Sequence, residues 1–233
     1  MNIIKVKNYE DLSRVAADII AEQIKTKPDS VLGLATGSSP IGTYENLVAD
    51  CKAGEISFKD VKTVNLDEYS GLSGDNVNSY RYFMNYNLFD KVDIDKNNTH
   101  VPNGTGDSVE ESKAYENLVA SMGYADLQLL GIGNNGHIGF NEPCDDFPAA
   151  THSVDLTEST IQANSRLFDS IDEVPRKAIT MGIGTIMKAK KILLIAGEGK
   201  ADIVEKSVYG KVIPQVPASV LQLHPDVTVV YIP

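Results

Sequence analysis

The chain has 233 residues, which is enough for one large or two small domains and for a substantial buried core. Its 21 Lys and Arg against 32 Asp and Glu give a formal net charge of −11 at pH 7. A field of this sign repels nucleic acid and anionic membrane surfaces, so we expect neither as a partner. An anionic small substrate would need cations placed close to its binding site.

Signals for export, membrane insertion and metal binding are missing from the sequence. The amino-terminal segment has no apolar run with a small-residue cleavage site, and no stretch approaches the roughly 18 apolar residues of a membrane span. We therefore expect a cytoplasmic protein. Cys51 and Cys144 are too far apart for a CxxC pair, and the histidines show no ligand spacing such as HExxH, so we predict no metal site.

The first elements are a helix, a strand and a second helix. Apolar residues at helical spacing predict a first helix that ends before Pro28, with Asn8 or Asp11 as its cap. Residues 31–35 are typical of a buried strand, and the small-residue turn 36–40 leads into the second helix. The first amides of a helix are unpaired, so this turn is a candidate anion cradle. A structural turn capped by one of its serines explains the pattern equally well.

The next predicted strand, residues 61–66, ends in two acids. Asp67 and Glu68 come where an open parallel sheet binds its ligands, beyond the carboxyl ends of the strands. Asp67, first after the strand, is the better candidate for an inward-facing base, whereas Glu68 is more simply explained as a residue that caps or solvates a loop. Residues 71–80 indicate a loop over the same edge, and the aromatic residues within 80–89 predict a helix packed on the core.

The stretch 127–143 carries the strongest functional signal. Its apolar run stops at the first of four glycines, which indicates a tight loop that a ligand can approach closely. Asn134, Asn135, His137 and Glu142 follow within nine positions. A histidine can move protons near neutral pH, and a nearby carboxylate can hold its tautomer. The simpler alternative, a tight turn with a satisfied histidine, does not account for the surrounding amides and carboxylate. A capping box of Ser108 and Glu111 opens the helix that leads into this stretch.

The polar segment after the glycine loop predicts a lid over approximately residues 144–175, which closes and excludes water. It contains Arg166, one of the few cations near these motifs. A buried strand at 191–196 then ends shortly before Lys200, at a strand-to-helix junction where a phosphate would also bind. A solvated surface lysine is the alternative.

About five or six short apolar strands alternate with helices, the later ones at 178–183, 191–196 and 227–232. No internal repeat or low-complexity linker interrupts them. This pattern predicts an α/β fold: one domain over residues 1–233, with a mainly parallel, modified Rossmann-like sheet covered by helices on both faces, and a lid.

Four separated blocks, in the same order and over nearly the whole chain, closely resemble the glucosamine-6-phosphate deaminase family. The blocks are Thr36–Pro40, Asn65–Tyr69, Gly131–Pro143 and Asn164–Phe168. The resemblance implies an intracellular, cofactor-free enzyme that converts glucosamine 6-phosphate and water to fructose 6-phosphate and ammonium.

The resemblance also implies roles for individual residues. Asp67 is the base that takes the C2 proton, His137 assists opening of the sugar ring, and Glu142 is the partner of that histidine. The residues implied for the 6-phosphate are Gly37, Ser38 and Ser39 through their backbone, Arg166 from the lid, and Lys200. The chemistry agrees, because moving a proton from C2 to C1 needs a carboxylate beside the carbon and a neutral-pH donor near the ring oxygen.

Asn135 departs from the family pattern, since many members carry Asp there as part of a proton relay. Asn cannot supply that charge, so we expect Glu142 to be the sole anionic partner of His137, with Asn135 as a hydrogen-bonding orienter. The chain also ends without the C-terminal extension of the allosteric hexameric members. His152 and Val154 stand where those members have basic residues for the effector. These departures predict an unregulated enzyme, monomeric or a small homo-oligomer.

Two other functions compete with this interpretation. A 6-phosphogluconolactonase-like hydrolase shares the phosphate loop and a Gly-x-Gly-x-x-Gly-His block, but here the block continues Phe-Asn-Glu-Pro, and Tyr69 stands where lactonases usually place Arg. A sugar-phosphate sensor domain would bind without turnover. Such domains commonly accompany a DNA-binding segment, whereas this chain has no basic helix-turn-helix and keeps Asp67, His137 and Glu142 together.

Overall fold

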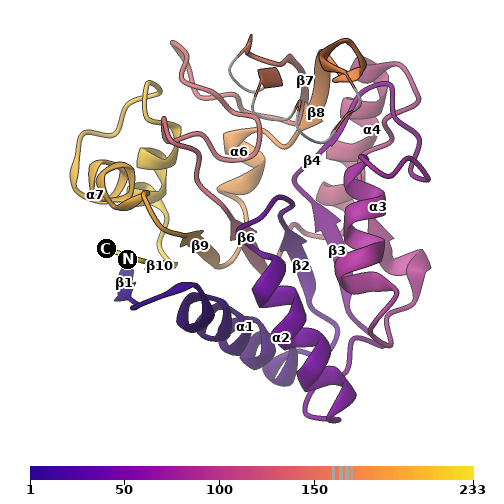
Figure 1. Cartoon of the computed structure of the whole chain (residues 1–233), viewed down its shortest axis with the longest axis vertical. Helices are drawn as coiled ribbons and strands as arrows, with labels where there is room; N and C mark the ends of the chain where they lie inside the picture. Colours follow the sequence, from indigo (N-terminus) through magenta and orange to yellow (C-terminus); the bar gives the residue numbers. More distant parts are fainter. Residues whose placement is uncertain (159–160, 163–164, 166–167, 169) are drawn as a thin grey trace.

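Short, fully buried strands build the centre of the protein. The computed structural model describes residues 1–158, 161–162, 165, 168 and 170–233. Within these residues a seven-stranded parallel sheet has the order β1-β10-β9-β6-β2-β3-β5 (Figure 1). Its strands are β1 (Asn2–Lys5), β2 (Val31–Leu34), β3 (Lys62–Asn65), β5 (Thr99–His100), β6 (Leu127–Leu130), β9 (Ile192–Ala196) and β10 (Val227–Tyr231). A parallel sheet is buried on both faces, which explains why its central strands are continuous apolar runs.

Helices pack on both faces of this sheet, as the α/β alternation predicts. They are α1 (Tyr9–Thr26), α2 (Ile41–Lys52), α3 (Tyr80–Met84) continued by a π-helical turn (Asn85–Phe89), α4 (Ser108–Ser121), α6 (Ile183–Ile186) and α7 (Ala201–Tyr209). Short 3-10 helices span Lys96–Asn98, Ile171–Glu173 and Pro217–Leu223. In Figure 1, α1 and α2 lie side by side in the lower half of the view. No helix among the described residues combines the length and apolar character needed to cross a bilayer.

The ends of two helices test the predicted caps. Asn8 caps α1, because its side-chain oxygen accepts from the backbone N–H of Asp11 at 2.8 Å. The predicted capping box of α4 is wrong, because the cap is Asp107 and not Ser108. The side chain of Asp107 accepts from the backbone N–H groups of Val109 and Glu110. The carboxylate of Glu111 instead accepts from the side chain of Asn103.

A second sheet of three antiparallel strands corrects the sequence prediction. It has the order β4-β8-β7, with β4 (Asp67–Tyr69), β8 (Lys177–Thr180) and β7 (His152–Asp155). The acids after β3 are therefore in a strand rather than a loop, the run at 178–183 does not join the large sheet, and part of the predicted lid is a strand. Leu66 connects the two sheets, since its N–H donates to Leu34 of β2 and its carbonyl accepts from Met181.

The hydrophobic core follows this division. A large cluster fills the space between the parallel sheet and its helices, and a smaller one lies under the antiparallel sheet. The smaller cluster consists of Tyr69, Phe140, Leu156, Ile161, Val174 and Ala178. It packs the second sheet against the glycine loop that follows β6, which brings Asp67 next to that loop.

Candidate active site

The turn between β2 and α2 leaves its backbone amides open. Gly37 has a φ of +92°, a conformation that residues with a side chain rarely adopt, so the sharp turn depends on this glycine. Neither serine of the turn caps α2: the N-cap is Pro40, and it makes no side-chain cap hydrogen bond. The capped structural turn is therefore the wrong alternative. Among the described residues nothing accepts from the N–H groups of Gly37, Ser38 or Ser39.

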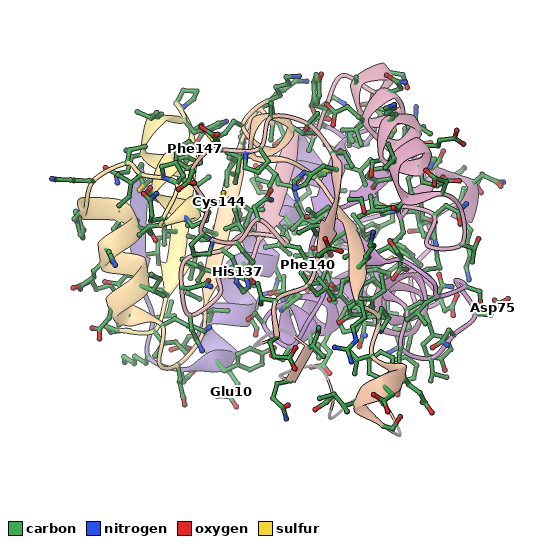
Figure 2. All side chains as sticks on the ribbon, turned by 90° about the horizontal axis from the view of Figure 1, so that it is seen from above. Glu10, Asp75, His137, Phe140, Cys144 and Phe147 are labelled. Carbon is green, nitrogen blue, oxygen red and sulfur yellow. The ribbon has the colours of Figure 1, made fainter. Side chains whose placement is uncertain are left out.

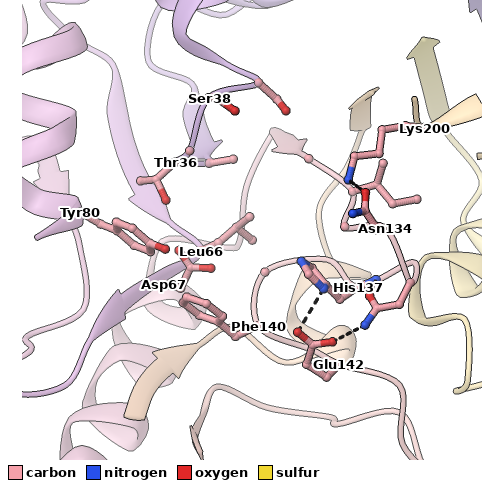
Figure 3. A pocket seen from close by; sticks show the side chains of 18 residues that line it. Thr36, Ser38, Leu66, Asp67, Tyr80, Asn134, His137, Phe140, Glu142 and Lys200 are labelled. Carbon is pink, nitrogen blue, oxygen red and sulfur yellow. Dashed lines mark hydrogen bonds and ion pairs between the residues drawn. The ribbon is translucent and has the colours of Figure 1, made fainter. Parts of the chain in front are cut away.

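These amides line a cavity of about 610 Å³ at the carboxyl ends of the parallel strands (Figure 3). Eight of the nine predicted site residues line it: Gly37, Ser38, Ser39, Asp67, Asn135, His137, Glu142 and Lys200. The ninth, Arg166, lies outside the described residues. Parallel strands bring their carboxyl ends to one edge of a sheet, which is how residues as distant in sequence as Gly37 and Lys200 converge here.

Asp67 forms one wall of the cavity. Its side chain is almost completely buried, and burial raises its pKa to about 8, with a smaller contribution from the negative charge of Glu68. The carboxylate of Asp67 fits here because position 139 is a glycine without a side chain. A Cβ at position 139 would lie 2.8 Å from Oγ1 of Thr180 and 3.5 Å from Oδ2 of Asp67, and the φ of +59° also disfavours any side chain there. Asp67 is thus an inward-facing carboxyl group that can hold or release a proton near neutral pH.

His137, Glu142 and Asn135 form a connected group on the opposite side of the cavity (Figure 3). Nδ1 of His137 lies 3.1 Å from Oε1 of Glu142, and Nδ2 of Asn135 donates to Oε2 of the same carboxylate at 2.6 Å. Oδ1 of Asn135 accepts from the backbone N–H of His137 at 3.2 Å, which fixes the orientation of the amide. The imidazole rests directly on Gly133, where a Cβ would fall inside contact distance of the ring.

Lys200 approaches the cavity from the junction of β9 and α7. It is partly buried, and this burial lowers the pKa of its ammonium group. Its Nζ contacts Oδ1 of Asn134, a second asparagine of the glycine loop. The alternative of a fully solvated surface lysine is therefore wrong, and the site has one described cation opposite the open amides of the turn.

Comparison with known proteins places this geometry in a family. Residues 7–230 match the family model described as glucosamine-6-phosphate isomerases/6-phosphogluconolactonase. The chain belongs to this family.

Two curated relatives are named glucosamine-6-phosphate deaminase. The protein of Clostridium perfringens (strain 13 / Type A) is 57% identical over 99% of this chain and 96% of its own length. That of Lachnoclostridium phytofermentans is 58% identical over 99% and 98%. A solved structure of a monomeric glucosamine-6-phosphate deaminase has a TM-score of 0.95 and 52% identity, covering 99% of this chain and 97% of that one. A 6-phosphogluconolactonase from Trypanosoma cruzi, at 19% identity and a TM-score of 0.76, shares the fold.

Tyr80 lines the cavity of this protein and was missed by the sequence analysis. It begins α3 and lines the cavity beside Asp67 (Figure 3). Its ring stacks on Phe140 with an interplanar angle of 8° and lies 4.8 Å from that of Tyr69. Both Phe140 and His137 lie near the centre of the molecule in the view of Figure 2. The aromatic spacing of 80–89 indicated core packing, and only the loop before Tyr80 hinted that this end of the helix faces a site.

Glu68 holds Tyr80 in place. Its carboxylate accepts from the backbone N–H groups of Tyr69, Tyr80 and Arg81 at 2.8 to 2.9 Å. The capping role predicted for Glu68 is confirmed, although the side chain is buried rather than solvated. As for metals, no group of three or more His, Cys, Asp or Glu side chains in the described part of the chain is arranged to hold one.

Proposed function

We infer that this enzyme converts glucosamine 6-phosphate and water to fructose 6-phosphate and ammonium. One observation carries the inference: a buried carboxyl group and a histidine paired with a carboxylate face each other across one cavity whose third side is a loop of open amides. The curated deaminases that match the whole chain at 57–58% identity support the same activity. The lactonase structures, at 20% identity or less, support the fold alone.

We propose that the substrate's phosphate binds the turn of Gly37, Ser38 and Ser39, opposite Lys200. A phosphate there accepts from the free amides and lies at the positive end of the α2 dipole. Lys200 adds a charge-assisted contact that offsets the repulsion expected from the overall charge of −11. The anchored phosphate directs the sugar carbons toward Asp67 and His137.

In this proposal Asp67 moves the proton between C2 and C1. The ammonium group on C2 brings a positive charge beside the carboxyl group, which favours its ionised, basic form. Asp67 takes the C2 proton from the open-chain aldehyde and returns it to C1, while one proton of the C2 ammonium group passes to the aldehyde oxygen; C1 becomes a CH2OH group and C2 a protonated imine. Water then adds at C2, ammonia leaves as ammonium, and the ketone of fructose 6-phosphate remains.

We propose that His137 opens the sugar ring by moving the proton of the C1 hydroxyl to the ring oxygen. Its Nδ1 faces Glu142, so Nε2 is the nitrogen available to the substrate (Figure 3). Glu142 holds the imidazole in that tautomer, and Asn135 holds Glu142 through its amide N–H. An amide suits this position because it donates to the carboxylate, whereas a second carboxylate would repel it.

The segment 144–175 is proposed as a lid that carries Arg166 to the phosphate. Its described part is held by β7, which pairs with β8, and by Leu156 and Ile161, which pack in the smaller hydrophobic cluster. We also propose that the enzyme is a monomer without allosteric control, as the related solved structure is described as monomeric. Light scattering after size exclusion should give the mass of one chain, and the rate should depend hyperbolically on substrate.

Two parallel assays test the function. The protein is incubated with glucosamine 6-phosphate while ammonia is followed, and with 6-phosphogluconolactone while acid release is followed. We expect ammonia and fructose 6-phosphate in equal amounts from the first and no acid above the spontaneous rate from the second. Enzymatic acid release without ammonia would identify a lactonase, and binding without either product would identify a sensor.

A further inference from the structure

The hydroxyl group of Tyr9 contacts the outer side of the proposed phosphate turn. Tyr9 is the first residue of α1, 29 positions before the turn in sequence. Its hydroxyl donates to the carbonyl of Ser38 at 3.0 Å, with that of Ser39 at 3.2 Å as a shared acceptor, and it accepts from the N–H of Gly42 at 2.9 Å. One side chain from another helix therefore bridges the turn and the start of α2.

These contacts set the direction of the turn's peptide groups. The chain has no cis peptide bonds, and in a trans peptide the N–H points opposite to the carbonyl before it. Because Tyr9 holds the carbonyl of Ser38 outward, the N–H of Ser39 points away from Tyr9. The long bond from Ile41 to the same carbonyl, at 3.4 Å, is the only other backbone contact to it among the described residues.

The turn of Gly37, Ser38 and Ser39 packs against little else, because it lies between two cavities. Ser38, Ser39 and Lys200 line the main cavity and also a second cavity of about 550 Å³ that Tyr9 borders. At its other end the turn is held by Tyr44, whose hydroxyl donates to the carbonyl of Ala35 at 2.6 Å. Two tyrosine hydroxyls thus fix the two ends of the segment that presents the amides.

Gly42, the second residue of α2, leaves room for the ring of Tyr9. A Cβ on Gly42 would collide with Oγ of Ser13 and lie 3.1 Å from Cε1 of Tyr9. The glycine therefore lets the ring approach the start of α2 closely enough for its hydroxyl to reach the turn. Packing alone does not require the hydroxyl, since the side chain is 36% exposed and a phenylalanine would keep the same ring contacts.

We propose that Tyr9 is a positioning residue of the phosphate site, which aims the amides of the turn at the anion through hydrogen bonds to the opposite side of the turn. This rests on the proposed function, because it assumes that the turn binds the phosphate of the substrate. Tyr9 is not among the described residues that line the main cavity with Asp67 and His137. It acts on the affinity for phosphate and not on the chemical steps.

The test compares Tyr9→Phe with Tyr82→Phe. Tyr82 is a matched control, because it is 37% exposed and its hydroxyl takes part in none of the hydrogen bonds of the turn among the described residues. We measure kcat and KM for glucosamine 6-phosphate, and the dissociation constant of inorganic phosphate by calorimetry. For Tyr9→Phe we expect KM and the phosphate dissociation constant to rise about three- to tenfold, as for one or two lost hydrogen bonds, with kcat within about twofold. The control should change none of these values.

Three outcomes would overturn the proposal: an unchanged phosphate dissociation constant in Tyr9→Phe, an equal rise in both variants, or a fall in kcat at constant KM. Thermal melts of both variants identify a folding defect, and a Tyr9→Phe enzyme that keeps its kcat is folded by that measure. If the wild-type protein released no ammonia, the proposed function would fail. The calorimetric comparison with phosphate would still decide the role of Tyr9.

Discussion

Asn135 donates a 2.6 Å hydrogen bond to Glu142, the same carboxylate that lies 3.1 Å from the imidazole of His137. The neighbouring Asn134 turns the other way and contacts Lys200. Two adjacent asparagines therefore serve different parts of one cavity. Asn135 supports the group that would transfer protons, and Asn134 supports the cation that would bind phosphate.

This difference predicts that two matched variants change different kinetic parameters. Asn135→Ala removes one hydrogen bond to the carboxylate of Glu142 and should lower kcat about tenfold or more with little change in KM, since hydrogen bonds to charged groups are worth about 1.5–3 kcal/mol. Asn134→Ala should raise KM and leave kcat within about twofold. Steady-state kinetics with glucosamine 6-phosphate distinguish the two. Equal effects on the same parameter would contradict this division.

Asp67→Asn keeps the shape of the side chain and removes its ability to accept a proton. We expect kcat to fall by about 10²–10⁴, the usual contribution of a positioned acid or base. The product fructose 6-phosphate should still bind, because the phosphate turn and Lys200 are unchanged. Ammonia production at the wild-type rate would show that another group is the base.

The same variant should also change how stability depends on pH. The pKa of Asp67 is about 8 in the folded protein against 3.8 for an ordinary Asp, so the folded state keeps a proton that the unfolded chain releases. Proton release by the unfolded chain therefore lowers the free energy of unfolding of the ligand-free protein increasingly as pH rises from about 4 to about 8. The free energy of unfolding of Asp67→Asn, minus that of wild type, should rise over this range and level off above it.

Urea unfolding of both proteins at pH 5, 7 and 9 measures this difference, and other titrating groups cancel in the subtraction. Asp75→Asn is a suitable control, because Asp75 is exposed and lies in the loop before α3. A constant difference between Asp67→Asn and wild type across this range would show that Asp67 has an ordinary pKa.

Gly133→Ala tests whether the histidine needs its place on the glycine backbone. A methyl group at position 133 occupies the space of the imidazole, so His137 must swing away and lose its contact with Glu142. We expect kcat to fall at least tenfold, because a misplaced catalytic group loses much of its effect. Gly197→Ala is the control, since a Cβ there meets nothing within 4 Å and the backbone has no positive φ. Near-normal kcat in Gly133→Ala would mean that the ring position is not critical.

The sequence by itself determined the elements with strong periodicity and the motifs that carry the chemistry. Helix α1 with its cap Asn8, the buried central strands and the glycine loop all follow from local patterns, because burial of one helix face or of a whole strand requires a particular spacing of apolar residues. The residues proposed for the site were also found locally, since the motifs contain them.

The tertiary structure alone decided how these motifs meet. The strand β4 consists of two acids and a tyrosine, and nothing in that composition predicts a strand, because its burial comes from β8 more than 100 residues later. The raised pKa of Asp67 has the same origin, as burial depends on neighbours that are distant in sequence. The contacts of Tyr9 and Tyr80 arise in the same way: a side chain's direction within a helix is local, but what it touches depends on the packing of the whole chain.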